Sequence, residues 1–415
     1  MHIFHPRRSV SKRFAFLSWA LLLTLLVGGC SSLPSIIQDN DAISTPEAKA
    51  AAQQQAMAQQ PAAYPVRRPP SAMGTAQTPT PAVANKVKVA LLVPLSGKSA
   101  SLGQAMANAA QLAVFDIASD GFELMPRDTK GTADGAAQAA REALASGANL
   151  VIGPLFAGDV GAVKPVLQPT GISMLALSTD VSLAETGAYV MGFAPAPQVD
   201  RVVDYAAAKG LRRFAAIVPP GPYGKLVMAS FENAVERNNG YIVAQVAPSN
   251  INELTANKDR IEAIFVPFAG VTLRTIAAQL TTAGFERGQV RLLGTGLWDE
   301  PNIAEGQALL QGGWFAAPEL SARERFIDKY KETYGATPPR LATLAYDATA
   351  LAAVLARHGM RYDQASLTSS SGFAGLDGVF RLRIGGQIER GLAVIELTEG
   401  GQHVIDPSPS TFSAR

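Results

Sequence analysis

Few side chains in this sequence of 415 residues could perform catalysis or hold a metal. The chain has one cysteine and four histidines, of which two stand at the N-terminus and two, His358 and His403, lie well apart. No Ser/His/Asp set and no His/Cys cluster with ligand spacing is present. A carboxylate pair could act as acid and base, but no spacing singles one out. The sequence therefore predicts no catalytic residue, no metal site and no cofactor, and a protein that is not an enzyme.

The segment Ser96-Gly97-Lys98-Ser99 lies between a predicted strand and a predicted helix, as the end of a phosphate-binding P-loop does. The full motif needs a glycine five residues before Gly97, where this chain has Leu92. Pro94 also lacks the backbone N–H that a phosphate cradle requires. The segment is therefore interpreted as a turn.

Cys30, the only cysteine, follows a basic head and an apolar run over residues 14–27. The run is shorter than the roughly 20 residues of helix that cross a bilayer, so residues 1–29 are interpreted as an export signal peptide. Leu26-Val27-Gly28-Gly29 before Cys30 resembles a bacterial lipobox, in which the signal is cleaved and the cysteine sulfur is lipidated. The other interpretation is an uncleaved membrane anchor, in which Cys30 has no role.

The charge and the cysteine count of the chain exclude some classes of partner and one means of stabilising the fold. The chain carries 36 Lys and Arg against 34 Asp and Glu, a formal charge of +2. Removing residues 1–29 takes away four basic and no acidic side chains, which leaves −2. No basic field remains to attract nucleic acid, and one cysteine allows no intramolecular disulfide. The fold must therefore be held by its apolar core.

Residues 30–85 have the composition of a tether. They are rich in Ala, Gln, Pro, Ser and Thr, with an Ala/Gln run at residues 50–55 and six prolines between Pro61 and Pro81. Such a segment buries too little apolar surface to offset the entropy of ordering. We expect a lipidated, disordered linker that spans roughly 40 Å on average as a flexible coil.

From residue 86 the sequence alternates between β-rich and helical patterns. Helical spacing of apolar residues is found at 102–118, 134–146, 160–167, 198–209, 225–238 and 273–283. Strands are predicted at 87–93, 122–126, 150–152, 173–177, 214–218, 241–246, 263–266, 290–293 and 313–316. This order is typical of an α/β fold with doubly wound, Rossmann-like parallel sheets.

The pattern changes near the C-terminus. Two helices are predicted in succession, at residues 322–334 and 341–358. Strands at residues 378–383 and 392–397 flank Gly385-Gly386, a pair typical of a hairpin turn. Residues 406–415 are expected to form a tail.

Loops at the carboxyl ends of the predicted strands carry the candidate ligand-binding residues. Ligands of parallel sheets bind at this edge, and hydroxyl and free N–H groups there suit a small polar ligand. The other interpretation is helix capping for the hydroxyl-bearing residues and core packing for Tyr223 and Trp298. The candidates are Ser96, Gly97, Gly153, Pro154, Leu155, Ser178, Thr179, Tyr223, Phe268, Thr295 and Trp298.

Several short motifs, in this order, resemble the type I periplasmic binding proteins of the branched-chain amino-acid receptor kind. They are VALLVPLSG at 89–97 with Gly103, VIGPL at 151–155, Tyr223-Gly224, AYDA at 345–348 and FAGLDG at 373–378. The resemblance covers essentially all of residues 86–405 and implies two doubly wound lobes with a central cleft. Lobe 1 is expected over about 86–193 and 314–375, and lobe 2 over about 194–313 and 376–405.

Within that superfamily the chain is most similar to the lipoprotein activators of penicillin-binding proteins. The similarity is carried by residues 94–98, 153–155, 175–178 and 390–392 and by the lipobox, and Ser31 resembles an outer-membrane sorting choice. It implies a periplasmic lipoprotein of the outer membrane that activates a peptidoglycan synthase, a class A penicillin-binding protein, by direct contact. The best-known members carry an N-terminal helical-repeat domain, which the tether replaces here.

The alternative is a solute receptor that binds a branched-chain amino acid or a related small polar ligand and feeds an ABC importer. In such receptors a hydroxyl-rich loop holds the ligand carboxylate, whereas the matching loop here, residues 154–157, has no hydroxyl. An acid usually meets the ammonium, and only Asp299 or Glu300 lies nearby. A zwitterion would lose charge-assisted bonds usually worth about 1.5–3 kcal/mol each. Both functions stay open at this point.

Overall fold

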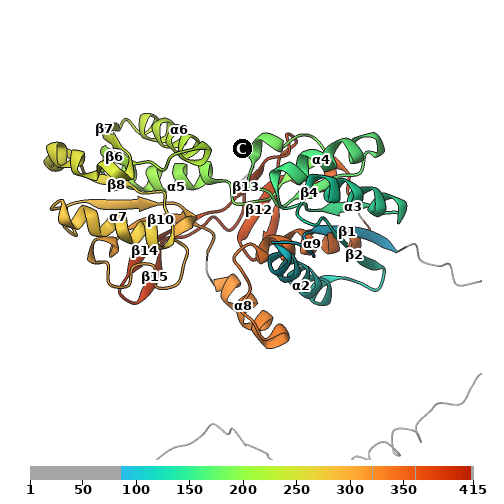
Figure 1. Cartoon of the computed structure of the whole chain (residues 1–415). Helices are drawn as coiled ribbons and strands as arrows, with labels where there is room; N and C mark the ends of the chain where they lie inside the picture. The colour runs from blue at the N-terminus through green and yellow to red at the C-terminus, as the bar shows by residue number, and fades with distance from the viewer. Residues whose placement is uncertain (1–85, 320, 360, 413–415) are drawn as a thin grey trace, which may run out of the picture. The chain divides into compact units, whose positions relative to one another are not determined.

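The computed structural model describes residues 86–319, 321–359 and 361–412 (Figure 1). They form two lobes, each built on a sheet with helices on both faces, so the predicted α/β class with doubly wound sheets is confirmed. The signal peptide, Cys30 and the tether lie outside the described residues. Within the described ranges, no helix combines the length and the apolar character needed to cross a membrane.

Lobe 1 is built on a five-stranded parallel sheet. Successive residues of its central strand face opposite layers: Val89, Leu91 and Val93 pack against α2 and α9, whereas Ala90 and Leu92 pack against α3 and α4. The strand order is β2 (Phe122–Asp128), β1 (Val87–Val93), β3 (Leu150–Ile152), β4 (Met174–Ala176) and β5 (Ala188–Val190). The helices are α2 (Ala100–Ile117), α3 (Ala133–Ala145), α4 (Ala157–Leu167) and, from later in the chain, α9 (Ala342–Arg357).

Lobe 2 is built on a seven-stranded sheet, of which β14 and β15 are antiparallel at one edge. Helices α5 (Pro195–Ala208) and α6 (Pro222–Arg237) cover one face, and α7 (Gly270–Thr282) with the 3-10 segment Pro248–Arg260 covers the other. The strand order is β15 (Gly401–Asp406), β14 (Ala393–Thr398), β10 (Trp314–Ala317), β9 (Arg291–Gly294), β8 (Ala263–Phe265), β6 (Arg213–Ile217) and β7 (Tyr241–Val246).

The predicted hairpin is wrong in part, because the structure has a third sheet there, which is three-stranded and antiparallel. This sheet consists of β11 (Phe373–Gly375), β12 (Gly378–Leu382) and β13 (Ile388–Arg390). Gly385-Gly386 lies in the turn as predicted, but the strand that returns is β13 and not residues 392–397. Those residues belong to β14, which pairs with β10 and β15 instead. The chain leaves this sheet at Gly391, so the returning strand is short.

The lobe boundaries also differ from those expected. Residue 314, expected to begin the return to lobe 1, opens β10 in the sheet of lobe 2. Residues 376–390, expected in lobe 2, pack through Phe380, Leu382 and Ile388 into the core of lobe 1. Helices α8 (Ser321–Tyr334) and α10 (Gln364–Leu367) lie in the segment between the last two crossings. The chain therefore passes between the lobes three times, after β5, after β10 and after β13.

Candidate ligand-binding cleft

A cavity of about 600 Å³, here called the cleft cavity, is lined by both lobes. The residues from lobe 1 follow β4 and β5 or precede α9. Those from lobe 2 lie in the first turns of α5, at the end of β10, or after β6, β9 and β10. Most of its lining therefore lies beyond the carboxyl ends of parallel strands, where α/β sheets place their ligands. The lining consists of Thr179, Asp180, Val181, Ser182, Phe193, Arg340 and Leu341 from lobe 1, and Pro195, Gln198, Pro222, Tyr223, Leu226, Thr295, Gly296, Leu297, Asp299, Ala317 and Pro318 from lobe 2.

Three of the predicted cleft residues, Thr179, Tyr223 and Thr295, line the cleft cavity. The Tyr223 hydroxyl lies 3.4 Å from Thr295 Oγ1, and burial raises the pKa of Tyr223. Thr295 Oγ1 also accepts a hydrogen bond of 3.4 Å from the backbone N–H of Leu297. The sequence offered capping and cleft lining as alternatives for Thr295, and in the structure this residue does both.

Trp298 and Phe268 do not line the cleft cavity and pack in the core of lobe 2. Trp298 is fully buried, and its Nε1 donates to the carbonyl oxygen of Val266 at 3.0 Å. Its ring occupies the space that a side chain at position 294 would take, because a Cβ on Gly294 would lie 2.2 Å from the indole. Trp298 thus follows the alternative of core packing, and Phe268, predicted only as a cleft residue, is a core residue too.

The remaining predicted residues are also absent from the cleft lining. Ser96 and Gly97 lie in a turn that Asp128 organises: its Oδ1 accepts from the N–H groups of Leu95 at 2.8 Å and Ser96 at 3.2 Å. Burial opposes ionisation of Asp128, but hydrogen bonds from the Ser96 side chain and from the N–H groups of Lys130, Leu95 and Ser96 outweigh it and lower the pKa. A carboxylate thus takes the donors that a P-loop would offer to phosphate. Gly153, Pro154, Leu155 and Ser178 are buried.

The walls of the cleft cavity are apolar. Val181, Leu226 and Leu297 are 38%, 40% and 39% exposed, although large apolar side chains are rarely left open to water in groups. The other large exposed apolar side chains of the described residues, Phe115, Tyr241, Val271 and Ile384, lie outside the cleft lining. Three large exposed apolar side chains thus share one cavity, where a ligand would cover them together.

A charge network extends from one wall of the cleft cavity, where Asp299 and Arg340 line it, into the protein. Asp299, whose side chain is 2% exposed, pairs with Arg323 on α8 and with Arg340, whose Nε lies 3.2 Å from Asp299 Oδ2. Arg340 also reaches Asp377 at 2.8 Å, and its guanidinium lies 4.2 Å from the ring centroid of Phe193. Asp299, one of the two acids expected near an amino-acid ammonium, is therefore already neutralised by two arginines.

Asp347 and Asp377, both with fully buried side chains, form the other half of the network. Asp347 Oδ1 accepts from the N–H of Leu376 at 2.7 Å, and its Oδ2 lies 3.6 Å from Arg390 Nη1. Burial, and then the neighbouring Asp377, raises the pKa of Asp347 to about 7. Burial also opposes ionisation of Asp377, but Arg340 and Arg390 outweigh it and lower its pKa.

We expect Asp347→Asn to remove a pH-dependent part of the stability. The pKa of Asp347 rises on folding from 3.8 to about 7, so the folded state holds this proton more tightly than the unfolded state. The Asp347 contribution to the free energy of unfolding should therefore fall as pH rises from about 4 to about 7. Urea unfolding of both proteins across that range should show the variant gaining on the wild type as pH increases.

The control for this prediction is Asp363→Asn, which should give the opposite trend. The Asp363 carboxylate accepts from the N–H of Ser366, and this bond lowers its pKa. Its contribution to stability is present at neutral pH and is lost as pH falls. A difference between wild type and Asp347→Asn that does not change with pH would contradict the raised pKa of Asp347.

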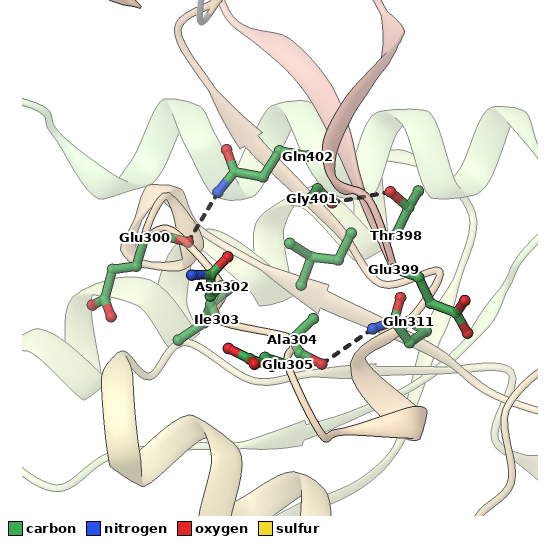
Figure 2. Close-up of a pocket in the computed structure, with 11 residues that line it drawn as sticks. Glu300, Asn302, Ile303, Ala304, Glu305, Gln311, Thr398, Glu399, Gly401 and Gln402 are labelled. Carbon is green, nitrogen blue, oxygen red and sulfur yellow. Dashed lines mark hydrogen bonds between the residues drawn. The ribbon is translucent and has the colours of Figure 1, made fainter. Parts of the chain in front are cut away.

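A smaller hollow of about 240 Å³ lies in lobe 2, between residues 300–305 and the turn from β14 to β15 (Figure 2). Gln402 Nε2 donates to the carbonyl oxygen of Glu300 at 3.2 Å, and Gln311 Nε2 donates to that of Ala304 at 3.1 Å. Glu300, the second acid expected near an ammonium, thus lines this hollow and not the cleft cavity. Among the described residues, no group of three or more His, Cys, Asp or Glu is placed to hold a metal ion.

Sequence reasoning missed the network and most of the apolar lining. Two of its acids stand inside motifs that carried the family resemblance, Asp347 in AYDA and Asp377 in FAGLDG. An acid within the otherwise apolar, alanine-rich α9 was a signal of a buried partner, because buried carboxylates need one. The sequence did not identify that partner, because Arg340 precedes α9 and Arg390 lies far beyond it in β13.

Sequence comparisons agree with this architecture. A model of the periplasmic binding protein family matches residues 86–402. An uncharacterized protein of Rickettsia prowazekii (strain Madrid E) is 22% identical over 155 residues, which make up 37% of this chain and 41% of that relative. The match therefore spans less than half of the relative's length.

Solved structures match the fold over most of the chain. A putative branched-chain amino acid ABC transporter protein from Rhodospirillum rubrum has a TM-score of 0.70 at 19% identity, covering 77% of this chain and 100% of its own. A branched chain amino acid ABC transporter periplasmic ligand-binding protein from Burkholderia xenovorans has a TM-score of 0.66 at 18% identity, covering 78% and 96%. A Rhodopseudomonas palustris solute binding protein in complex with 3,4-dihydroxy benzoic acid has a TM-score of 0.57 at 19% identity, covering 80% and 98%. At such identities the likeness concerns the fold.

Proposed function

The chain belongs to the periplasmic binding protein family, and on that premise we propose that it is a receptor that binds a small ligand in the cleft cavity. The observation that carries the proposal is the cavity itself, whose volume of about 600 Å³ falls within the roughly 300–1,000 Å³ of ordinary ligand pockets. Both lobes line it, so a ligand there would contact them together.

The solved relatives support a receptor without naming its ligand. They include complexes with 3,4-dihydroxy benzoic acid, with benzoate and with Leu. One fold therefore serves chemically different ligands, and the choice among them belongs to the residues that line each cleft. A receptor of this kind would hand its ligand to the permease of an ABC importer, which is the partner we propose for it.

A thermal-shift screen tests the receptor function. The purified protein is screened against amino acids, carboxylates, amides and peptidoglycan fragments. A ligand at a hundredfold excess over its Kd should stabilise the folded state by about 2.7 kcal/mol. The shift should disappear in Leu226→Asp, which places a charge on the cleft wall, and persist in Val271→Asp, an exposed apolar position outside the cleft. A flat screen, or a shift that Leu226→Asp retains, would contradict the proposal.

A second candidate function is contact activation of a peptidoglycan synthase, a class A penicillin-binding protein. It is supported by the neutralisation of Asp299 by Arg323 and Arg340 and by the absence of hydroxyls from residues 154–157, both of which depart from an amino-acid receptor. The test is a pull-down with purified class A penicillin-binding proteins together with a glycan-polymerisation assay. An activator should bind and raise the polymerisation rate, and this candidate fails if neither occurs.

We also propose that Cys30 anchors the protein, in the periplasm, to the outer membrane through an attached lipid. Replacing the sulfur removes the acceptor, so Cys30→Ala should abolish labelling by a radioactive fatty acid and leave soluble protein or unprocessed precursor. Ser31→Ala keeps the acceptor and should keep the label, while its distribution between membranes would report on sorting. A Cys30→Ala protein of mature size that still sediments with the membrane would refute the anchor.

A further inference from the structure

We infer that the cleft cavity selects an uncharged, largely apolar ligand and discriminates against zwitterions, anions and cations of the same shape. This inference rests on the proposed receptor function and deepens it by naming the ligand class. Three observations carry it: the apolar walls, the pairing of several polar groups within the protein, and the balance of charge in the network.

The apolar walls come from both lobes. Val181 and Phe193 belong to lobe 1, whereas Leu226 and Leu297 belong to lobe 2. Val181, Leu226 and Leu297 are each more than a third exposed. A ligand between the lobes would cover apolar surface on two sides, which stabilises binding in proportion to the apolar area removed from water.

Several polar groups of the lining are already paired inside the protein. Gln198 Nε2 donates to the carbonyl oxygen of Ala194 at 3.1 Å, and its Oε1 accepts from the N–H of Gly296 at 2.7 Å. The Tyr223 hydroxyl faces Thr295 Oγ1 at 3.4 Å. A charged ligand group would have to displace these bonds to be satisfied, whereas an apolar ligand leaves them intact.

The charges of the network are paired within the protein. Asp299 and Asp377 pair with Arg340, Asp299 also pairs with Arg323, and Asp347 pairs with Arg390. These three carboxylates and three guanidinium groups balance one another. Asp180, the other charged side chain of the lining, is exposed, so water and salt screen its charge, and its Oδ1 accepts from the N–H of Ser182 at 3.0 Å and from its hydroxyl at 2.6 Å. Arg340 uses Nε, Nη1 and Nη2 in this network but has five N–H donors, so it can still donate to a neutral carbonyl.

The test is a series of four probes that share one branched carbon skeleton. 4-Methylpentanamide is uncharged, 4-methylpentanoate is an anion, isopentylamine is a cation and leucine is a zwitterion. Their Kd values are measured by displacement of the uncharged dye N-phenyl-1-naphthylamine, which brightens when it leaves water. The measurements are made at about pH 8, where Asp347 is ionised and the network is balanced. The amide should bind at least about tenfold more tightly than the other three, since one unmet charged hydrogen bond costs a factor of about ten or more.

A variant that adds a positive charge to the cleft wall should reverse the order in which the probes bind. Leu297→Lys places a cation at the cleft wall, so 4-methylpentanoate should overtake the amide in this protein. Val271→Lys adds the same charge at a position outside the cleft lining and should leave the order of the four probes unchanged. Both positions are exposed, so the variants are expected to fold, which circular dichroism verifies.

The outcomes separate the inference from the receptor function. If leucine, the carboxylate or the amine binds as tightly as the amide or more tightly, and Leu226→Asp abolishes that binding, the inferred ligand class is wrong. The proposed receptor function is then still supported. Dye binding that Leu226→Asp and Leu297→Lys do not change places the dye elsewhere and also overturns the inference. A flat broad screen overturns the receptor function, and the inference with it.

Discussion

Arg390→Leu should lower the free energy of unfolding by about 3–5 kcal/mol, the usual cost of removing one partner from a buried ion pair. The side chain is 6% exposed and lies near Asp347 and Asp377, which have no access to water. Leucine fits the apolar space beside Phe193 and Phe380, whose rings Arg390 now overlies. The loss therefore comes from uncompensated charge and not from a void.

The control for Arg390→Leu lies in the same hairpin. Arg383 pairs with Glu389 at 2.9 Å but is 51% exposed, and exposed pairs contribute about 0–1 kcal/mol. Urea unfolding of Arg383→Leu should therefore differ little from the wild type. Equal losses in the two variants would show that Arg390 contributes no more than a surface charge.

Gly103→Ala should lower the free energy of unfolding by about 3 kcal/mol, at the upper end of the usual cost of overpacking. Gly103 lies in the first turns of α2, where a Cβ would stand 1.9 Å from the carbonyl oxygen of Pro94. Backbone cannot rotate aside as a side chain does, so either the helix or the end of β1 must shift. Thermal and urea unfolding measure the loss.

Gly161→Ala is the matched control, because it adds the same methyl group to another helical glycine. No atom lies within 4 Å of a Cβ at Gly161, in the middle of α4. Alanine restricts the unfolded chain and suits a helix better, so this variant should gain about 0.5–1 kcal/mol. If both variants lose stability, the close contact between α2 and Pro94 is not the cause of the loss in Gly103→Ala.

Hydrophobic periodicity predicted most strands of the two sheets and the helices that cover them, but it missed the edge strands β5 and β15. It could not assign short strands to sheets, because strand pairing depends on which residues meet across long stretches of chain. β10 looks like any buried strand, and only its pairing with β9 and β14 places it in lobe 2. Residues 392–397 were assigned to the wrong partner for the same reason.

The candidate site was predictable only in part. The rule that ligands lie beyond strand ends found Thr179, Tyr223 and Thr295. It failed for Trp298, whose ring turns into the space left free at Gly294, because side-chain direction is not set by position in the chain. Val181 and Leu226 were missed since exposed apolar residues cannot be told from core residues without the fold.

The threading of the chain between the lobes has a consequence for the order in which the protein can be made. β10 is hydrogen-bonded on one side to β9 and on the other to β14, which begins only at Ala393. Until that last segment has been synthesised, lobe 2 presents a buried strand, Trp314–Ala317, as an open edge, and such edges promote aggregation. Lobe 2 therefore cannot be completed before residues 393–406 have been synthesised, and neither lobe corresponds to one continuous piece of sequence that could be expressed or exchanged alone.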